Sequence, residues 1–266
     1  MQASLAGRTA LITGGARRIG RETALALAEQ GVGVVIHYNR SEGEARQVAA
    51  EIKVKGAKAW TVRADFRHPP DYQSLIARTR AVTGGRLDIL INNASIFPAE
   101  RLGELTWPGL SADLQVNAWV PLTLSREFAR GLARGGIINL HDTRLKGFDF
   151  RHSGYILSKH VLAELTRMMA LELAPNVTVN AVAPGLILPP PGEDERYLED
   201  HAPLVPLKRH GHPRDIAEAI VYLLHADFVT GQVIYVDGGR HLHEWGPTAS
   251  SFGGESHARE AQSPAG

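Results

Sequence analysis

The sequence predicts an α/β protein with a single doubly wound parallel sheet and helices on both faces. Short apolar runs, such as residues 9–13 (TALIT) and 32–38 (VGVVIHY), are suited to buried parallel strands. These runs alternate along the chain with helical stretches, which is the pattern of repeated βαβ units. The chain has 266 residues, 44% of them hydrophobic, and this is enough for one large domain of the class.

Most expected elements carry a boundary signal. A Gly-rich turn after the first strand leads into a helix over about 18–30, which Gly31 ends. The strand over 32–38 precedes a helix from Ser41, a candidate N-cap, to about 55, with Gly56 as its stop. The other expected elements are strands over 58–63, 88–91, 137–140, 177–182 and 233–236, and helices over 69–82, 111–134, 153–173 and 213–224.

No linker interrupts the first 240 residues, so we expect one domain over 1–243. The segment 185–212 is rich in Pro, Gly and charge, and is predicted to be a mobile flap that closes over the substrate. Residues 244–266 are poor in apolar side chains, which predicts a disordered tail; a role for the tail in ligand binding stays open.

Composition narrows the class of protein. The net charge is +1 and basic residues are scattered, which argues against nucleic acid or an anionic membrane as partner. The chain has no cysteine, which excludes disulfides and thiolate chemistry. The first strand begins near the N-terminus, without room for a signal peptide, and a cytoplasmic protein is expected. The pairs His210/His212 and His241/His243 lack a partner acid, so no metal site is expected.

The turn at 13–20 (TGGARRIG) lies between the first strand and the first helix, where dinucleotide-binding folds of the Rossmann type hold a pyrophosphate. Gly14 and Gly20 permit a tight backbone, and the helix N-terminus offers free N–H groups to an anion. At the end of the second strand, Arg40 takes the place of the acid that usually binds the ribose of NAD. With Arg17 and Arg18 nearby, these cations favour NADPH, unless they form only a solvated basic edge.

An acid, a phenol and an ammonium group are expected to converge between 136 and 159. Tyr155 and Lys159 are one helical turn apart, and Asp142 follows the preceding strand. Tyrosine has an unperturbed pKa of about 10, and a nearby cation lowers it. The alternatives are that Tyr155 and Lys159 are ordinary surface residues, and that Asp142 only caps a loop.

The ordered set of motifs resembles the short-chain dehydrogenase/reductase family over about residues 5–242. The matches are the turn at 13–20, Asp65, the run 92–94 (NNA), Asn117, the Tyr155/Lys159 pair, Pro184-Gly185 and the run 236–239 (VDGG). The resemblance implies that Tyr155 donates the proton and that Lys159 binds the nicotinamide ribose. It also implies that Asn117 holds a water leading to Lys159, and that the protein is a homotetramer.

Three departures from the common family pattern look like its pteridine reductase branch. Asp142 replaces the usual serine thirteen positions before Tyr155, Ser95 replaces a glycine, and Arg18 replaces the middle glycine of the phosphate turn. The run 37–41 (HYNRS) points the same way, and the runs 184–190 and 229–242 look like dihydromonapterin reductases. In that branch the equivalent of Phe97 stacks the pterin, although here it could also be a core residue.

The chemistry of pterin reduction explains why this position carries an aspartate, Asp142, and not a serine. Hydride goes to a ring carbon and the proton to the adjacent ring nitrogen, so no carbonyl oxygen needs a serine donor. A carboxylate beside Tyr155 disfavours phenolate by like-charge repulsion, and it can relay a proton from solvent. The leading hypothesis is therefore NADPH-dependent reduction of a dihydropterin, of the dihydromonapterin or dihydrobiopterin type. The alternatives are a carbonyl reductase and an NADP(H)-binding regulatory protein without turnover.

These arguments give the following candidate site. The catalytic residues are Asp142, Tyr155, Lys159 and Asn117. The cofactor-binding residues are Gly14, Arg17, Arg18, Ile19, Gly20, Tyr38, Asn39, Arg40, Ser41, Asp65, Phe66, Asn92, Ala94, Ser95, Lys159, Pro184 and Gly185. The substrate-binding residues are Arg17, Ser95, Phe97, Asp142, Tyr155 and Leu186.

Overall fold

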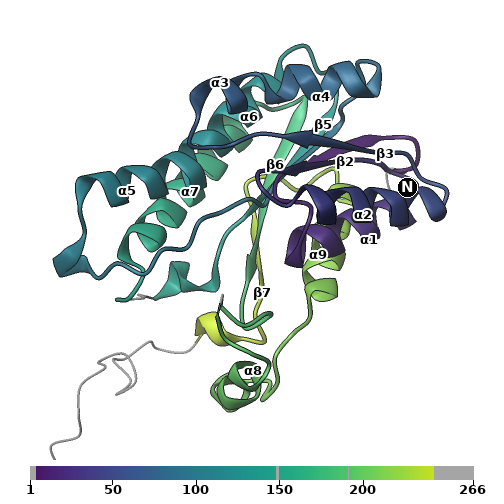
Figure 1. The fold of residues 1–266 in the computed structure, drawn as a ribbon. Helices are drawn as coiled ribbons and strands as arrows, with labels where there is room; N and C mark the ends of the chain where they lie inside the picture. The colour runs from purple at the N-terminus through teal and green to yellow at the C-terminus, as the bar shows by residue number, and fades with distance from the viewer. Residues whose placement is uncertain (1–3, 148–149, 191, 243–266) are drawn as a thin grey trace, which may run out of the picture.

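The computed structural model describes residues 4–147, 150–190 and 192–242, so the predicted tail lies outside the described residues. Its centre is a seven-stranded parallel sheet in the order β3-β2-β1-β4-β5-β6-β7 (Figure 1). The strands are β1 (Thr9–Ile12), β2 (Gly33–Tyr38), β3 (Ala59–Arg63), β4 (Ile89–Asn92), β5 (Gly135–Leu140), β6 (Val177–Pro184) and β7 (Val233–Val236). This confirms the predicted fold class.

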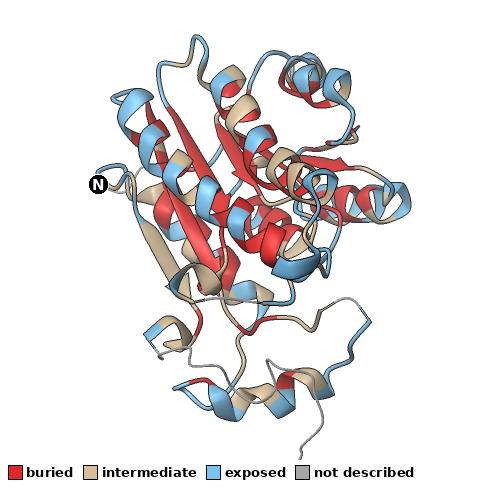
Figure 2. Ribbon diagram, turned by 90° about the vertical axis from the view of Figure 1, so that its left-hand side faces the viewer, coloured by how far each residue is buried: buried red, intermediate tan, exposed pale blue. Residues whose placement is uncertain are grey.

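Helices cover both faces of the sheet. The first face carries α1 (Arg18–Glu29), α2 (Glu42–Val54) and α9 (Pro213–His225), and the second carries α4 (Leu75–Thr83), α6 (Val120–Ala129) and α7 (Ser153–Glu172) (Figure 1). Successive residues of β1 point to opposite faces of the sheet and so belong to different hydrophobic cores. Ile12 packs with α1 and α9, and Leu11 packs with α4 and α6. Figure 2 shows most of the sheet buried and the outer helix surfaces exposed, while β7 at the sheet edge is of intermediate burial.

Two predicted helices are interrupted. The stretch predicted over 69–82 forms α3 (Pro69–Gln73) and α4, with a break at Ser74, whose hydroxyl donates to the carbonyls of Pro70 and Asp71. The region predicted over 111–134 begins earlier, as α5 (Trp107–Leu114), capped by the side chain of Thr106. It continues through a five-residue π-helical segment, Gln115–Trp119, into α6.

The predicted flap contains regular secondary structure, and its mobility stays a prediction. It contains a short helix, α8 (Arg196–His201), and a 3-10 turn, Ala202–Leu204. Leu198 and Val205 bury against Leu186, which forms a small hydrophobic cluster separate from the two main cores. Burial of these apolar side chains stabilises a local structure that the Pro and Gly content of the segment does not predict.

Sheet topology fixes where a ligand binds. The chain runs outward from β1 through β2 to β3 and then crosses back to β4 on the other side of β1, so a crevice opens at the carboxyl ends of β1 and β4. The loops after β1, β4, β5 and β6 all reach this edge. These loops carry the phosphate turn, Ser95, Asp142 and Gly185, and most of the predicted site is therefore brought together there.

Candidate active site

The phenol of Tyr155 forms a hydrogen bond with Asp142. Tyr155 lies in the first turn of α7, and its hydroxyl donates to Oδ2 of Asp142 over 2.9 Å. The other carboxylate oxygen, Oδ1, accepts from the backbone N–H of Arg144 over 2.8 Å and caps the 3-10 helix Thr143–Lys146. Asp142 thus has both roles that the sequence left as alternatives: it caps a loop and it partners Tyr155.

Lys159 lies beneath this pair and is almost fully buried, with 3% exposure. Its Nζ donates to the carbonyl of Leu140, at the end of β5, over 2.7 Å, and lies 5.6 Å from the centre of the Tyr155 ring. Burial lowers the pKa of Lys159 to about 8, and the charge of Asp142 opposes this shift. Neither Tyr155 nor Lys159 is an ordinary surface residue, and that alternative is wrong.

Asn117 lies in the π-helical segment and joins the loop after β4 to α7. Its Oδ1 accepts from Ser95 Oγ and from the Ile96 N–H, both over 2.9 Å. Its Nδ2 donates to Ser158 Oγ over 3.0 Å and to the Ile96 carbonyl over 3.1 Å. The structure therefore gives Asn117 a positioning role, and its predicted role in holding a water stays a prediction.

Phe97 forms one wall beside Tyr155. Its ring stacks on His152 with centroids 3.7 Å apart and meets the Tyr155 ring edge-on at 4.6 Å. The guanidinium of Arg144 lies 5.4 Å from the centre of the Phe97 ring. Phe97 is partly exposed and lines the cavity, so it is not a core residue.

The phosphate turn is held by one side chain from β2 and one from the loop after β4, on either side of β1. The N–H of Gly14 donates to Nδ1 of His37 over 3.1 Å, and Nε2 of the same ring lies 3.1 Å from the carbonyl of Ala64. Burial lowers the pKa of His37 to about 4, so this ring is neutral at pH 7. Asn93 donates to the carbonyl of Thr13 over 2.8 Å. These bonds fix the turn.

The residues of this turn fit a dinucleotide pyrophosphate. Arg17, at the N-cap of α1, gives the helix no side-chain cap, and Ile19 and Gly20 line the cavity at its first turn. A Cβ added at Gly20 would collide with the carbonyl of Gly14, so the turn is built around bare backbone. Arg18 has a left-handed backbone with φ of +53°, and its guanidinium donates to the Pro189 carbonyl over 2.7 Å, across the cleft.

Some of the predicted site residues line one cavity of about 530 Å³, and others do not. Those that line it are Gly14, Arg17, Arg18, Ile19, Gly20, Ala94, Ser95, Phe97, Asp142, Tyr155, Lys159, Pro184, Gly185 and Leu186. Those that do not are Tyr38, Asn39, Arg40, Ser41, Asp65, Phe66, Asn92 and Asn117. Arg17 was predicted to bind the cofactor and the substrate, but its exposed guanidinium pairs with Glu44 in this structure.

Three of the residues predicted to bind the cofactor have buried side chains. Asn92 is buried in a polar network, where it donates to Asn139 Oδ1 over 2.8 Å, and its neighbour Asn93 lines the cavity in its place. Phe66 stacks on His37 with centroids 4.5 Å apart, and Tyr38 belongs to the core on the α1 side. We therefore correct the side-chain assignments of Asn92, Phe66 and Tyr38 to core packing.

Further residues line this cavity that were not named individually as site residues: Asn93, Leu140, His141, Thr143, Arg144, Ile187, Leu188, Pro190, Tyr197 and Arg240. Those from 187 to 197 lie in the segment predicted to close over the substrate. For Thr143 and Arg144 a signal existed, since they directly follow Asp142. Arg240 directly follows the VDGG run, which marks the end of the last strand. Tyr197 lies in α8, within the segment predicted to be a mobile flap over the substrate, but no motif singled it out.

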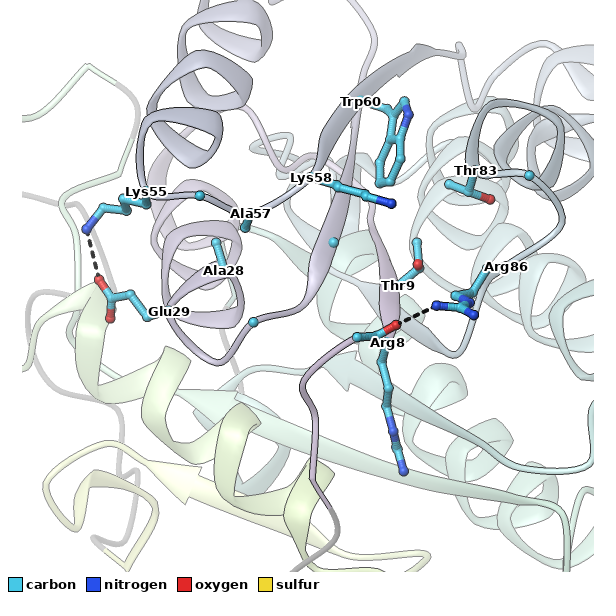
Figure 3. A pocket seen from close by; sticks show the side chains of 15 residues that line it. Arg8, Thr9, Ala28, Glu29, Lys55, Ala57, Lys58, Trp60, Thr83 and Arg86 are labelled. Atoms are coloured by element: carbon cyan, nitrogen blue, oxygen red, sulfur yellow. Dashed lines mark hydrogen bonds and ion pairs between the residues drawn. The ribbon is translucent and has the colours of Figure 1, made fainter.

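A second cavity, of about 770 Å³, lies at the opposite, amino-terminal edge of the sheet (Figure 3). Lys58, Trp60, Thr83 and Arg86 surround it, and Lys55 pairs with Glu29 at its rim over 3.3 Å. Helices α1, α2 and α4 end near this edge, so lysines and arginines there complement the partial negative charge of helix C-termini. The helix ends thus explain the basic side chains of the second cavity. We place the active site in the first cavity, which contains Asp142, Tyr155 and Lys159.

Within 4–147, 150–190 and 192–242, no three His, Cys, Asp or Glu side chains are arranged to hold a metal ion. His212 instead forms a capping box with Asp215 at the start of α9, and His241 binds Asp237 over 2.9 Å. His243, the partner predicted for His241, lies outside the described residues. The helices in the described part of the chain are too short or too polar to cross a membrane.

Comparisons with known proteins agree with this geometry. A family model described as enoyl-(acyl carrier protein) reductase matches residues 14–241. The chain is similar to versicolorin reductase 1 of Aspergillus parasiticus, with 35% identity over 88% of this chain and 97% of that protein. It is also similar to 3-oxoacyl-(acyl-carrier-protein) reductase of Staphylococcus aureus, with 32% identity over 88% of this chain and 98% of that protein.

Solved structures extend the likeness to three dimensions. The crystal structure of FolM alternative dihydrofolate reductase 1 from Brucella canis, complexed with NADP, superposes with a TM-score of 0.87. It is 32% identical and covers 92% of this chain and 98% of its own. The Brucella suis protein of the same name, also with NADP, gives 0.86, with 32% identity over 91% of this chain and 98% of its own. The matched length, the fold and the Tyr155/Lys159 geometry agree, and the chain is an NAD(P)-dependent reductase of the short-chain dehydrogenase/reductase family.

Proposed function

We propose that this reductase uses NADPH to reduce a dihydropterin, of the dihydromonapterin or dihydrobiopterin type, to the tetrahydropterin. The observation that carries the proposal is the 2.9 Å hydrogen bond from Tyr155 to Asp142. A carboxylate in this place suits reduction of a ring C=N bond, which leaves no carbonyl oxygen to be held by a serine. The likeness to two proteins named alternative dihydrofolate reductase supports the same substrate class.

The proposed reaction needs one hydride and one proton. NADPH, when bound, supplies the hydride to a ring carbon of the dihydropterin. The Tyr155 O–H bond breaks, its proton goes to the adjacent ring nitrogen, and the C=N bond becomes CH–NH. The tyrosine then regains a proton through Asp142, whose side chain is 17% exposed and therefore reaches solvent. Phe97 offers an aromatic wall on which the flat pterin ring stacks.

The preference for NADPH over NADH rests on the end of β2. Arg40 is exposed there, and Asn39 and Ser41 flank it without an acid that would repel a 2′-phosphate. The acids that follow are paired, since Glu42 binds Arg46 over 2.6 Å, Glu44 binds Arg17, and Asp65 binds Arg67 over 3.1 Å. The complexes of both Brucella proteins with NADP support this choice.

The test is NADPH oxidation by the full chain with dihydropterins and with a panel of ketones. We expect turnover with dihydrobiopterin or dihydromonapterin and little with ketones. Asp142→Ser is expected to lower kcat on the pterin by about 10²-fold, which is at the low end for loss of a proton-transfer group. Fast ketone turnover without pterin turnover would show that the proposal is wrong.

A second candidate function is reduction of a ketone. The names of the relatives favour it, since versicolorin reductase 1 and 3-oxoacyl-(acyl-carrier-protein) reductase align over 88% of this chain. In that case Asp142 stands in for a serine, and Asp142→Ser would retain or gain activity on a ketone. The same variant therefore separates the two candidates.

A further inference from the structure

We propose that Tyr197, on the flap helix α8, determines substrate specificity by forming a hydrogen bond with a hydroxyl group on the side chain of the substrate. This inference rests on the proposed function, because it names the class of dihydropterin that the site prefers. The preferred substrates carry a hydroxylated carbon chain on the flat ring. A dihydropterin without such a chain is expected to be a poorer substrate.

Tyr197 belongs to the wall of the active-site cavity. Its side chain is partly buried and lines the cavity that also contains Phe97 and Asp142. The phenol is close enough to the guanidinium of Arg240, which lines the same cavity, for the two groups to interact electrostatically. Arg240 follows the edge strand β7, and β4, β5 and β6 separate that strand from β1 and its phosphate turn. The phenol is therefore at the substrate end of the cavity.

The ring of Tyr197 is held in place by its own helix. His201, one turn later, stacks on it with ring centroids 4.0 Å apart and 22° between the two planes. Nδ1 of His201 lies 2.7 Å from the Tyr197 carbonyl, and since a carbonyl only accepts, the histidine ring donates. The ring of Tyr197 also packs against the buried cluster of Leu186, Leu198 and Val205. Less conformational freedom is therefore lost when this ring binds a substrate.

The hydroxyl of Tyr197 is available to a ligand. Within the described part of the chain it has no hydrogen-bond partner, and its oxygen is not buried. The neighbouring polar groups differ, because Tyr155 donates to Asp142 over 2.9 Å and the guanidinium of Arg144 lies 3.7 Å from the same carboxylate. An uncharged group that both donates and accepts is thus presented to the substrate beside groups that already interact with one another.

A substrate hydroxyl is the group that matches this phenol best. Each of the two hydroxyls donates one hydrogen bond and accepts another, so the pair can bond in either direction. A methyl group in the same place would displace water from the phenol and leave it without a partner, which weakens binding. The discrimination therefore comes largely from the penalty on a substrate that lacks the hydroxyl.

The experiment compares two dihydropterins as substrates of wild type and Tyr197→Phe. One is dihydrobiopterin, and the other carries a methyl group in place of the hydroxylated chain. We expect the ratio of kcat/KM for dihydrobiopterin to that for the methyl compound to fall about fivefold in Tyr197→Phe, mainly through KM. Phenylalanine keeps the ring that stacks on His201, so the helix is retained. Tyr222→Phe, an exposed tyrosine on α9, should leave the ratio unchanged.

A binding measurement keeps this inference separate from the proposed function. Calorimetric titration of the NADP-loaded protein with oxidised biopterin, and in parallel with the oxidised methyl compound, needs no turnover. A preference for biopterin that Tyr197→Phe removes supports the role of Tyr197 even if no dihydropterin is reduced, and that outcome rejects only the proposed function. Reduction of both dihydropterins with an unchanged ratio in Tyr197→Phe overturns the role of Tyr197 alone. Binding of neither pterin, together with no reduction, rejects both proposals.

Discussion

At the scale of single residues, Asp142 shows why a carboxylate and a serine are not equivalent here. One oxygen caps the 3-10 helix Thr143–Lys146 and the other accepts the proton of Tyr155. A serine has one oxygen and cannot hold both partners in this geometry. The sequence placed this residue correctly because it comes thirteen positions before Tyr155, but it could not show that both roles coexist.

The charge of Lys159 predicts the alkaline side of the pH profile. Its pKa is about 8, so the ammonium is lost as pH rises through that value, and we expect kcat/KM to decline above about pH 8. The negative charge of Asp142 raises this pKa, so Asp142→Asn should move the decline to lower pH. The measurement is kcat/KM against pH for both proteins, with the exposed Asp194→Asn as control. A decline that stays in place or moves to higher pH in Asp142→Asn would contradict the assignment.

Asp113 predicts a pH-dependent stability. It is 1% exposed, packs against Gly154, and its two oxygens have no hydrogen-bond partner among the described residues. Burial raises its pKa to about 6, and the charge of Glu100 adds to the shift. The folded protein therefore holds this proton more tightly than the unfolded chain, and stability is lost as pH rises from about 4 to about 6.

Asp113→Asn removes that penalty. At pH 8 we expect the free energy of unfolding to rise by about 3 kcal/mol, which is roughly the cost of a shift of this size. At pH 4 the gain should vanish, because the wild-type carboxyl is then neutral. Urea unfolding at both pH values measures it, with the exposed Asp200→Asn as matched control. A gain that is the same at pH 4 and pH 8 would argue against ionisation as the cause.

At the scale of elements, the sequence predicted every strand, with ends displaced by at most two residues, because apolar runs between glycines and charges are unambiguous. It failed where tertiary contacts decide. Helix α8 exists because Leu198 buries against Leu186, and nothing local to the Pro-rich segment signals this. The break between α3 and α4 depends on a hydroxyl that competes for backbone carbonyls, which propensity alone does not rank.

Gly20 in α1 and Gly43 in α2 allow two Gly→Ala substitutions to be compared, because the space around the added Cβ differs between them. A Cβ at Gly20, in α1, would collide with the Gly14 carbonyl, whereas a Cβ at Gly43, in α2, would meet nothing within 4 Å. Gly20→Ala should therefore destabilise by about 1–3 kcal/mol and weaken NADPH binding, because the phosphate turn must move. Gly43→Ala should stabilise by about 0.5–1 kcal/mol without changing binding. Thermal unfolding and fluorescence titration with NADPH test both, and similar behaviour of the two variants would contradict the steric argument.

The same scale explains which site residues were predictable. Motif residues on the loops after β1, β4, β5 and β6 converge because parallel strands end at one edge. Asn92 was misassigned because β4 extends one residue further than predicted, which turns Asn92 inward and leaves Asn93 facing the cleft. Arg240 was missed because its placement depends on a bond between Thr143 and Asp237, 94 residues apart.

At the scale of the whole molecule, α7 has an exposed apolar stripe. Leu157, Val161, Met168 and Leu171 recur at helical spacing and are 42–83% exposed. Exposed tryptophans at 107 and 119, on the neighbouring helices, extend this surface. A monomer rarely exposes so much apolar area on one face, so we expect copies of the chain to pair here and to form a homotetramer.

Charges introduced on the stripe should break this assembly. Met168→Glu combined with Leu171→Glu is expected to lower the molar mass in solution by at least half, because a charge cannot be buried unpaired in an interface. Sedimentation or light scattering measures it, with Val54→Glu on α2, an isolated exposed residue, as control. A wild-type protein that is monomeric at micromolar concentration would reject the expected tetramer.

The bond between Thr143 and Asp237 also has a consequence for synthesis on the ribosome. Strands β1 to β6 and the phosphate turn are made once the chain has reached Pro184, but the bond from Thr143, next to Asp142, to Asp237 needs residues made near the end of translation. A chain that stops before Val233 keeps the nucleotide-binding half and lacks both the tether and Arg240. Premature termination there would leave the loop that carries Asp142 without its bond to Asp237.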